Sequence, residues 1–303
     1  MIATSLDRFR VAGGEAQGVP LHPRFVVRFD RLLASSADYR PNFAIRSGVF
    51  TNVTFREIRV DPVARQVIFV IADDLLPQTR YVLHVESGPD ASSRLAAIDG
   101  APFDGPFDQP FTTESARESG EVDETTFDPD STPDDPCLAA AIFAQSCAGA
   151  NCHDSATQAP AMGLDLSSSA GVQATAVDHA AVSVAYESTP VAGEPAAGVF
   201  PYGLPIIRTG QSAASYLIYK VLRRGPAGDP AGAAAADPSF VMGDVPDPAA
   251  RVVADLQAVR GSGMPHDSLP SDPTLSGPLP PLQWSEVHLL RRWIDAGARP
   301  CTR

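Results

Sequence analysis

Short β-strands dominate the hydrophobic pattern in the first third of the chain. Residues 24–29 are rich in β-formers, and the apolar run at residues 66–71 is typical of a strand buried on both faces. In residues 81–85, Tyr81, Leu83 and Val85 fall on one face of a strand and Val82 and His84 on the other, and turn formers separate the three runs. Because no long helical period interrupts them, the pattern predicts an all-β sandwich over residues 1–113.

The segment 114–136 breaks this pattern. It combines many acids with several prolines and has almost no apolar residues, so it cannot build a core. Repulsion between its acids favours an extended chain, which predicts a flexible acidic linker between two domains. A calcium site is the alternative, but the acids do not follow an EF-hand loop pattern.

Helical periodicity appears in the remainder, residues 137–303. The Asp-Pro pair at 135–136 can cap a helix whose apolar stripe leads to Cys147. Further helices are predicted over residues 212–224 and 282–296. The inner face of the last helix is expected to hold Val287, Leu290, Trp293 and Ile294. Loops rich in Ala, Pro and Gly separate these helices, so we expect a mainly α domain with long loops.

The length of the chain allows two domains, and its charge excludes some classes of binding partner. A chain of 303 residues with 44% hydrophobic residues can bury two cores. Its formal charge of −13 argues against nucleic acid and anionic membrane surfaces, which need clusters of Lys and Arg. No run approaches the ~18 apolar residues of a membrane span, so we expect no transmembrane segment. The opening residues also lack the apolar core of a signal peptide, so no export signal is visible.

The stretch Cys147-Ala-Gly-Ala-Asn-Cys152-His153 carries the chemistry. Covalent haem attachment needs two thiols and a histidine directly after the second one, usually with two residues between the cysteines. Here four small residues intervene, one of them a glycine that can absorb the extra length. These residues alone leave three interpretations open: a haem site, a Cys147–Cys152 disulfide loop beside an incidental histidine, or another metal site.

A second axial ligand for haem iron would come from a loop, and methionine is the common choice in electron carriers. Met264 lies in a Gly-Ser-Gly-Met-Pro sequence, in which glycines free the backbone and proline stiffens it. Met162 and Met242 are its competitors, and His266 is the rival sixth ligand. A lone methionine is more often packing than a ligand.

The first domain resembles a bacterial Ig-like domain. The resemblance rests on His22-Pro23 before the strand at 24–29, on Leu75-Leu76-Pro77-Gln78-Thr79-Arg80-Tyr81, and on Phe111-Thr112-Thr113. It implies a structural or spacer module that contacts other envelope proteins.

The second domain resembles a bacterial cell-envelope cytochrome c-like domain of planctomycete type. Five elements occur in the order of that family: Ile142-Phe143 ahead of Cys147 and Cys152-His153; Gly163-Leu164-Asp165-Leu166; Ser215-Tyr216-Leu217; Met264-Pro265; and Trp293-Ile294-Asp295-Ala296-Gly297-Ala298. The resemblance implies that the first and last helices cross with one haem c between them. It also implies thioethers from Cys147 and Cys152, His153 as proximal ligand and Met264 as distal ligand.

Cys137 and Cys301 flank the first and last helices of this domain. If the helices cross as the resemblance implies, the two sulfurs come within bonding distance, and the alternative is two free thiols. A disulfide and haem c attachment both indicate a compartment outside the cytoplasm.

The first hypothesis is therefore a periplasmic, cell-surface or secreted protein that binds one covalent haem and transfers electrons to a redox partner protein. It would not be an enzyme, although a haem peroxidase is a minor alternative. The rival hypothesis is a non-haem envelope interaction or spacer protein, with an Ig-like domain and a degenerate cytochrome domain stabilised by a disulfide.

Overall fold

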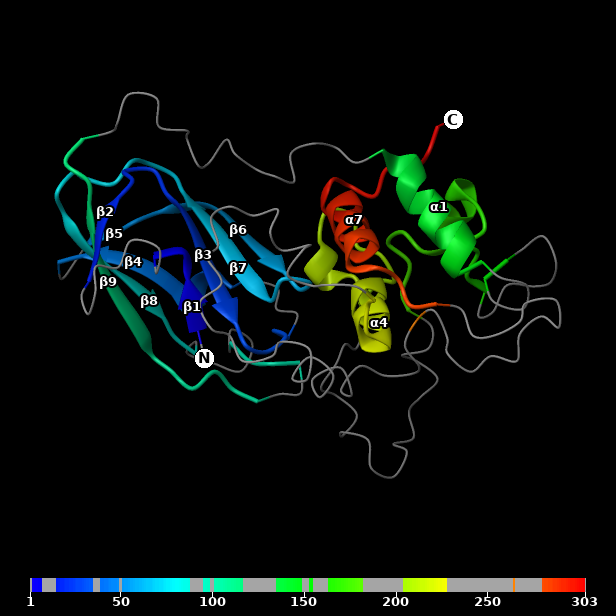
Figure 1. Cartoon of the computed structure of the whole chain (residues 1–303), viewed down its shortest axis with the longest axis horizontal. Helices are drawn as coiled ribbons and strands as arrows, with labels where there is room; N and C mark the ends of the chain where they lie inside the picture. The colour runs from blue at the N-terminus through cyan, green and yellow to red at the C-terminus, as the bar shows by residue number, and fades with distance from the viewer. Residues whose placement is uncertain are drawn as a thin grey trace. The chain divides into compact units, whose positions relative to one another are not determined.

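A computed structural model of the chain describes residues 2–6, 15–34, 39–48, 51–87, 95–98, 101–116, 135–148, 153–154, 163–181, 204–227, 264 and 280–302. These residues form two compact units, one of strands before residue 117 and one of helices after residue 134 (Figure 1). The predicted division into a sheet region and a helical region is confirmed. Most of the predicted linker 114–136 lies outside the described residues.

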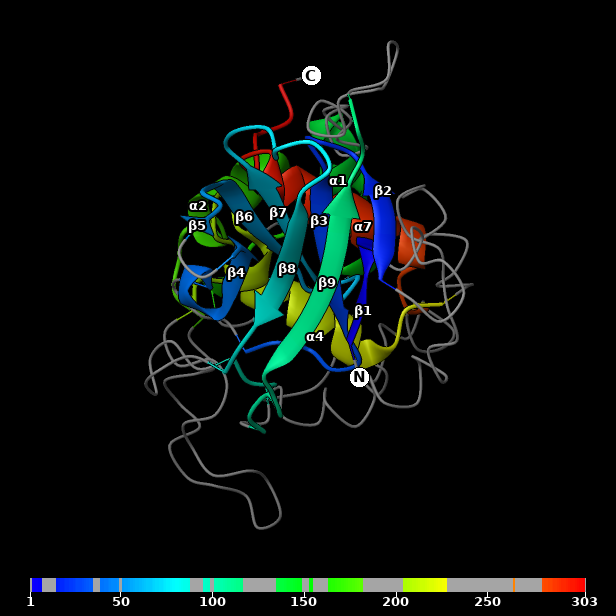
Figure 2. The same ribbon diagram turned by 90° about the vertical axis from the view of Figure 1, so that its left-hand side faces the viewer.

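Two sheets make up the first unit. One is antiparallel, in the order β1 (Ile2–Thr4), β3 (Arg24–Phe29), β7 (Gln66–Ile71), β6 (Phe55–Asp61). The other has the order β2 (Ala16–Val19), β9 (Phe107–Thr113), β8 (Arg80–Val85), β4 (Phe43–Ser47), β5 (Thr51–Asn52), with β2 parallel to β9 and the other pairs antiparallel. A 3₁₀ turn, η2 (Arg40–Asn42), leads into β4. Figure 2 looks onto this second sheet, with β8 and β9 in front.

Aromatic side chains join the two sheets across one core. The Phe69 ring of β7 is fully buried and lies 5.4 Å from Phe25, 5.4 Å from Phe43 and 5.1 Å from Phe55, centroid to centroid. Phe25 in turn contacts Phe111 of the opposite sheet at 5.6 Å. These contacts across the interior make the unit a two-sheet sandwich.

The three strands read from the sequence are present. Residues 24–29 and 66–71 coincide with β3 and β7, and β8 begins one residue before the predicted run 81–85. The Leu-Pro-Gln-Thr segment forms the turn into β8, where the Tyr81 hydroxyl accepts a hydrogen bond from Leu76 N at 2.9 Å. The coarse fold of this unit is thus confirmed, and its Ig-like identity stays a prediction.

The second unit contains α1 (Pro136–Ser146), α2 (Ser169–Thr175), the 3₁₀ turn η4 (Ser212–Ala214), α4 (Tyr216–Arg224) and α7 (Trp284–Asp295). Helix α7 packs against α1, α4 and η4, and α2 packs against α1 (Figure 1). All four residues predicted for the inner face of the last helix are buried. Among the described helices, none combines the length and apolarity needed to cross a bilayer.

One continuous helix over 212–224 was the wrong prediction, because the backbone breaks at Ser215. This residue is extended, with φ −106° and ψ 114°. Its hydroxyl donates to Gln211 O at 2.9 Å and accepts from Arg208 N at 2.8 Å. A serine side chain that bonds to the local backbone competes with helical hydrogen bonding, which explains the break.

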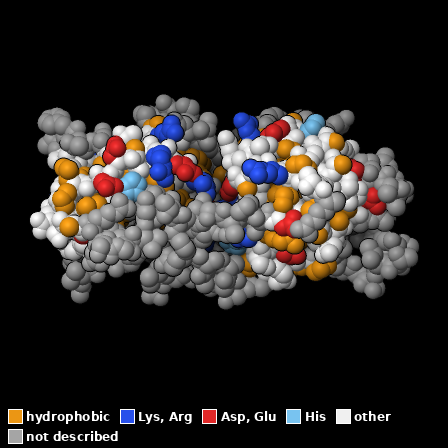
Figure 3. All heavy atoms as spheres, turned by 90° about the horizontal axis from the view of Figure 1, so that it is seen from above, with side chains coloured by type: hydrophobic (Ala, Val, Ile, Leu, Met, Phe, Trp, Pro, Cys, Tyr) orange, Lys and Arg blue, Asp and Glu red, His pale blue; other side chains and the backbone are white. Residues whose placement is uncertain are grey.

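The described surface is mixed in character. On the face seen in Figure 3, positive and negative side chains are interspersed in both units, and neither sign gathers over the described residues. Two large hydrophobic side chains among those residues are exposed, Leu76 at 64% and Leu138 at 50%. They lie in different units, so isolated exposed leucines rather than one apolar patch are seen.

The buried Phe69 ring should dominate the stability of the sheet unit. Phe69→Ala removes contacts with rings from both sheets and should lower the free energy of unfolding by about 3–5 kcal/mol. Urea denaturation followed by circular dichroism measures this loss, and Leu76→Ala, at an exposed position, serves as the control. Equal effects of the two substitutions would contradict the role assigned to Phe69.

Candidate functional site

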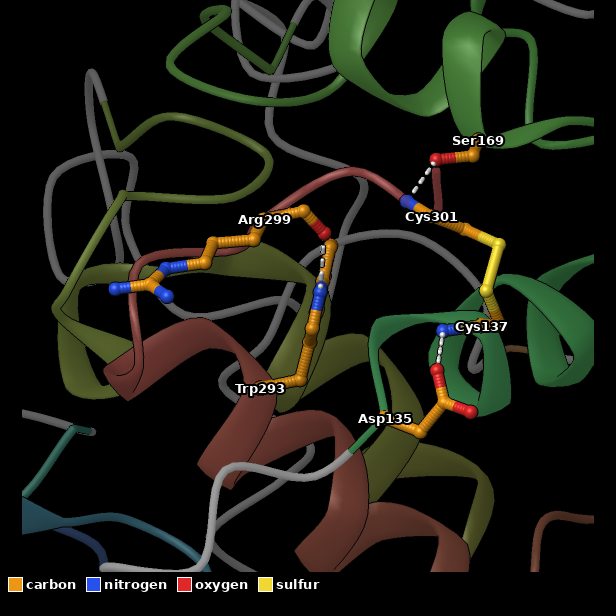
Figure 4. Close-up of a disulfide and its surroundings, with 6 residues drawn as sticks. All are labelled: Asp135, Cys137, Ser169, Trp293, Arg299 and Cys301. Atoms are coloured by element: carbon orange, nitrogen blue, oxygen red, sulfur yellow. Dashed lines mark hydrogen bonds between the residues drawn. A yellow bond between two sulfur atoms is a disulfide. The ribbon is translucent and has the colours of Figure 1, made fainter. Parts of the chain in front are cut away.

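Helix α1 carries the chain to Cys147. The helix starts at a capping carboxylate, because Asp135 Oδ1 accepts a hydrogen bond from Cys137 N at 3.0 Å (Figure 4). It ends where the amides of Cys147 and Ala148 both donate to Phe143 O, at 2.8 and 3.0 Å. The Cys147 side chain is 3% exposed. The helix therefore fixes the first cysteine of the motif at its buried end.

His153 is held directly beside Cys147 by its backbone. The His153 amide donates to Cys147 O at 3.4 Å, and His153 O accepts from Leu166 N at 2.8 Å. The histidine is partly buried, whereas Leu166 is 1% exposed. Residues 149–152 lie outside the described part of the chain, and so does the predicted thioether from Cys152. The structure thus brings the first cysteine and the histidine of the motif together.

The Gly-Leu-Asp-Leu segment has a structural role that the sequence analysis did not assign. Asp165 Oδ1 accepts hydrogen bonds from Ser167 N at 2.9 Å and Ser167 Oγ at 2.6 Å. A Cβ atom on Gly171 would lie 2.4 Å from the Asp165 carboxylate, so only glycine fits at this point of α2. The turn at Asp165 thus leads into α2, which Ser168 caps, while the next residue, Leu166, bonds to His153 O.

Met264 is tied to another element. Its amide donates to Lys220 O of α4 at 2.9 Å, and the residue is partly buried. The two predicted iron ligands are thus anchored separately, His153 at the end of α1 and Met264 on α4. The competing residues Met162, Met242 and His266 lie outside the described residues.

The first and last helices of the unit pack through an aromatic pair. The Phe143 and Trp293 rings meet edge to face, with centroids 5.7 Å apart and planes at 69°. Trp293 Nε1 also donates to Arg299 O at 2.9 Å (Figure 4). The indole therefore contacts α1 on one side and holds the C-terminal segment on the other.

The last helix ends in a Schellman motif. Ala298 N donates to Trp293 O and Gly297 N donates to Ile294 O, each at 2.9 Å. Gly297 adopts φ +99°, which a residue with a Cβ atom rarely takes. The motif turns the chain out of α7 toward Cys301.

Cys137 and Cys301 form a disulfide in the structure, with Cα atoms 4.7 Å apart and a sequence separation of 164 (Figure 4). Of the two alternatives that the sequence left open, the bonded one is therefore present. Cys301 N donates to Ser169 Oγ at 2.7 Å, and Gln173 Nε2 donates to Ala298 O at 2.6 Å. These bonds attach the C-terminal segment to both α1 and α2.

A buried ion pair supports the same region. Asp295 accepts hydrogen bonds from Ser212 N at 2.8 Å and Ser212 Oγ at 3.1 Å, and its carboxylate lies 3.3 Å from Arg291 Nη1. The Arg291 and Asp295 side chains are 4% and 11% exposed. Sequence reasoning missed this pair, although the i, i+4 spacing of the two charges on one helix was a visible signal.

Asp178 is an exposed carboxylate that, like the buried Asp295, accepts hydrogen bonds from a nearby hydroxyl and amide. Thr209 Oγ1 and Thr209 N donate to its carboxylate at 2.7 and 3.1 Å, and these hydrogen bonds lower the pKa of Asp178 below its ordinary value. Because the pKa of this carboxyl is lower in the folded protein, its ionisation stabilises the fold at pH values above the ordinary carboxyl pKa. This contribution is lost as the pH falls through the lowered pKa of the folded state.

Metal clusters of the usual kind are not seen: no three His, Cys, Asp or Glu side chains among the residues that the structure describes are grouped to hold an ion. A haem iron needs only axial ligands from the protein, so this finding bears on metals bound by side chains alone.

Asp295→Asn should destabilise the helical unit by about 3–5 kcal/mol, because it leaves the buried Arg291 guanidinium without its carboxylate. The free energy of unfolding from urea denaturation measures the loss. Asp178→Asn makes the same chemical change at an exposed carboxylate and should cost much less. A loss as large at Asp178 would contradict the argument from burial.

Replacing both Cys137 and Cys301 by serine should lower the free energy of unfolding by about 3–5 kcal/mol, because the bond closes a long loop in the unfolded chain. A reducing agent should bring the unmodified protein to the stability of the double variant and leave the variant unchanged. Equal stability of the two proteins without reductant would contradict this expectation.

Comparisons with known proteins identify no family. No family model matches the chain, and no curated protein does. Among solved structures, similarity is found to domains 1–6 of the surface layer protein SbsC, with 17% identity, 34% of this chain and 13% of that chain covered, and TM-score 0.27. Similarity is also found to the N-terminal part of the bacterial S-layer protein SbsC, with 20% identity, 32% of this chain and 22% of that chain covered, and TM-score 0.26. The chain spans only a small part of these proteins, and at such TM-scores the likeness carries no conclusion.

Proposed function

We propose that the chain is an extracytoplasmic c-type cytochrome-like protein that binds one covalent haem and passes electrons to a partner protein. An Ig-like spacer domain precedes the haem domain in this proposal. The observation that supports it is the backbone contact between His153 and Cys147, which brings the histidine of the motif next to the cysteine at the end of α1.

The donor set fits the group chemically. Cys147 offers a buried sulfur at a fixed helix end, His153 offers an imidazole, and Met264 offers a thioether on a backbone anchored to α4. These are the group types that haem c takes for attachment and for its two axial positions. When bound, the haem supplies reversible one-electron chemistry at its iron. The chain's own task is to hold the attachment and ligand residues in place, through α1, α4 and α7.

The disulfide supports the proposed compartment. Bonds such as Cys137–Cys301 form and persist in oxidising environments, and are rare in the reducing cytosol. The resemblance to a cell-envelope cytochrome c-like domain implies that haem c is also attached outside the cytoplasm. The disulfide therefore supports a periplasmic, surface or secreted location.

The proposal predicts covalent haem on protein made in a host that matures c-type cytochromes. After acid-acetone extraction, the denatured chain should weigh one haem more than its sequence, and its reduced pyridine spectrum should be that of haem c. Cys147→Ser should reduce covalent attachment, and Met264→Ala should keep the haem but change the iron to high spin. An unchanged spin state in Met264→Ala would instead favour His266 or an open sixth position, as in a peroxidase.

A chain at its bare mass, lighter by two hydrogens for each disulfide, would contradict the proposal. Cys147 and Cys152 lie in one tryptic peptide, because no Lys or Arg occurs between residues 118 and 207. A disulfide within that peptide between the two cysteines would then support the non-haem spacer alternative. The double variant Cys137→Ser, Cys301→Ser is the matched control, because it removes two other cysteines and should still carry haem.

A further inference from the structure

Arg223 presents a buried donor without an acceptor. The residue lies in the last turn of α4, where its side chain is partly buried, and its Nη1 atom is shielded from solvent. Among the residues that the structure describes, this nitrogen has no hydrogen-bond partner. Leaving a buried donor unsatisfied costs about 1–3 kcal/mol, and more when the group is charged. The protein retains this arginine at a cost, which indicates an acceptor from outside the described chain.

The position of Arg223 links it to a predicted ligand. Lys220 and Arg223 are one turn apart on α4, so they lie on neighbouring parts of the same helix face. Lys220 O holds the Met264 amide at 2.9 Å. The opposite face of the helix is buried, with Ile218, Val221 and Leu222 each at most 1% exposed. The side of α4 that anchors Met264 is therefore also the side that carries the unsatisfied cation.

We propose that Arg223 binds a propionate carboxylate of the haem, an inference that rests on the proposed function. A guanidinium binds a carboxylate through two parallel N–H···O hydrogen bonds, and such charge-assisted bonds are about twice as strong as neutral ones. Haem carries two propionates at one edge of the ring. With Met264 as distal ligand, α4 would border the haem, and Arg223, one turn after Lys220, would hold a propionate.

The test compares Arg223→Gln with Arg299→Gln. Arg299 is exposed, and Trp293 bonds to its backbone oxygen, so the second substitution removes the same charge and keeps that hydrogen bond. Each full-length variant is made twice, with haem c maturation and in a host without it. In the haem-loaded protein, Arg223→Gln should lower the Tm by roughly 4–8 °C, because a charge-assisted hydrogen bond is lost. It should also lower the midpoint potential, because a nearby cation disfavours the ferric iron.

In the haem-free protein, Arg223→Gln should leave the Tm unchanged or raise it, since it removes an unsatisfied donor. Arg223→Lys keeps the charge but loses the planar fork, so its potential should stay near that of the unmodified protein while its Tm falls. Arg299→Gln should change none of these quantities.

Three results would overturn the assignment, and they separate its failure from that of the proposed function. An unmodified protein without covalent haem overturns both. A haem-loaded Arg223→Gln that matches Arg299→Gln in Tm and potential overturns only the role of Arg223. Inorganic phosphate or acetate that raises the Tm of the haem-free protein, but not of haem-free Arg223→Gln, would show that the partner is a free anion rather than a propionate.

Discussion

The arrangement of the helical unit depends on the packing of α1 against α7. The two helices come from opposite ends of the unit's sequence, and the edge-to-face contact of Phe143 with Trp293 joins them at 5.7 Å. Helix α7 packs both against α1, which ends at Cys147, and against α4, which bonds the Met264 amide. Helix α1 ends at Cys147, while the end of α7 directs the chain back to α1 and α2. Because α1 and α4 both pack against α7, a displacement of α7 would change the position of Cys147 relative to Met264, whose amide is bonded to α4.

Short helices explain why this pair has additional support. The described helices of the unit have 7 to 12 residues, and helices of that length are marginal in isolation. Three further interactions add to the apolar contacts of these helices: the Arg291–Asp295 ion pair, the Schellman motif at Gly297 and the Cys137–Cys301 disulfide. The sheet unit shows no comparable disulfide among its described residues, and its core of aromatic rings spans both sheets. The two units thus reach stability by different means.

Sequence patterns predicted the elements better than the interactions between them. Alternation and apolar runs gave β3, β7 and β8, and the Asp-Pro pair at 135–136 gave the start of α1, because these signals are local. The break at Ser215 arises from side-chain bonds to residues four and seven positions earlier, which helical periodicity does not register. Helix α2 was missed because it is short and built from small and polar residues.

The candidate site shows the same limit more sharply. The spacing of cysteines and histidine identified Cys147 and His153, and the structure brings both to the end of α1. Spacing gave no sign of the unsatisfied nitrogen of Arg223, because burial of a single atom depends on the tertiary fold. Among the described residues, the Arg223 guanidinium has a buried nitrogen without an acceptor. Under the proposed function, a haem propionate would supply that acceptor.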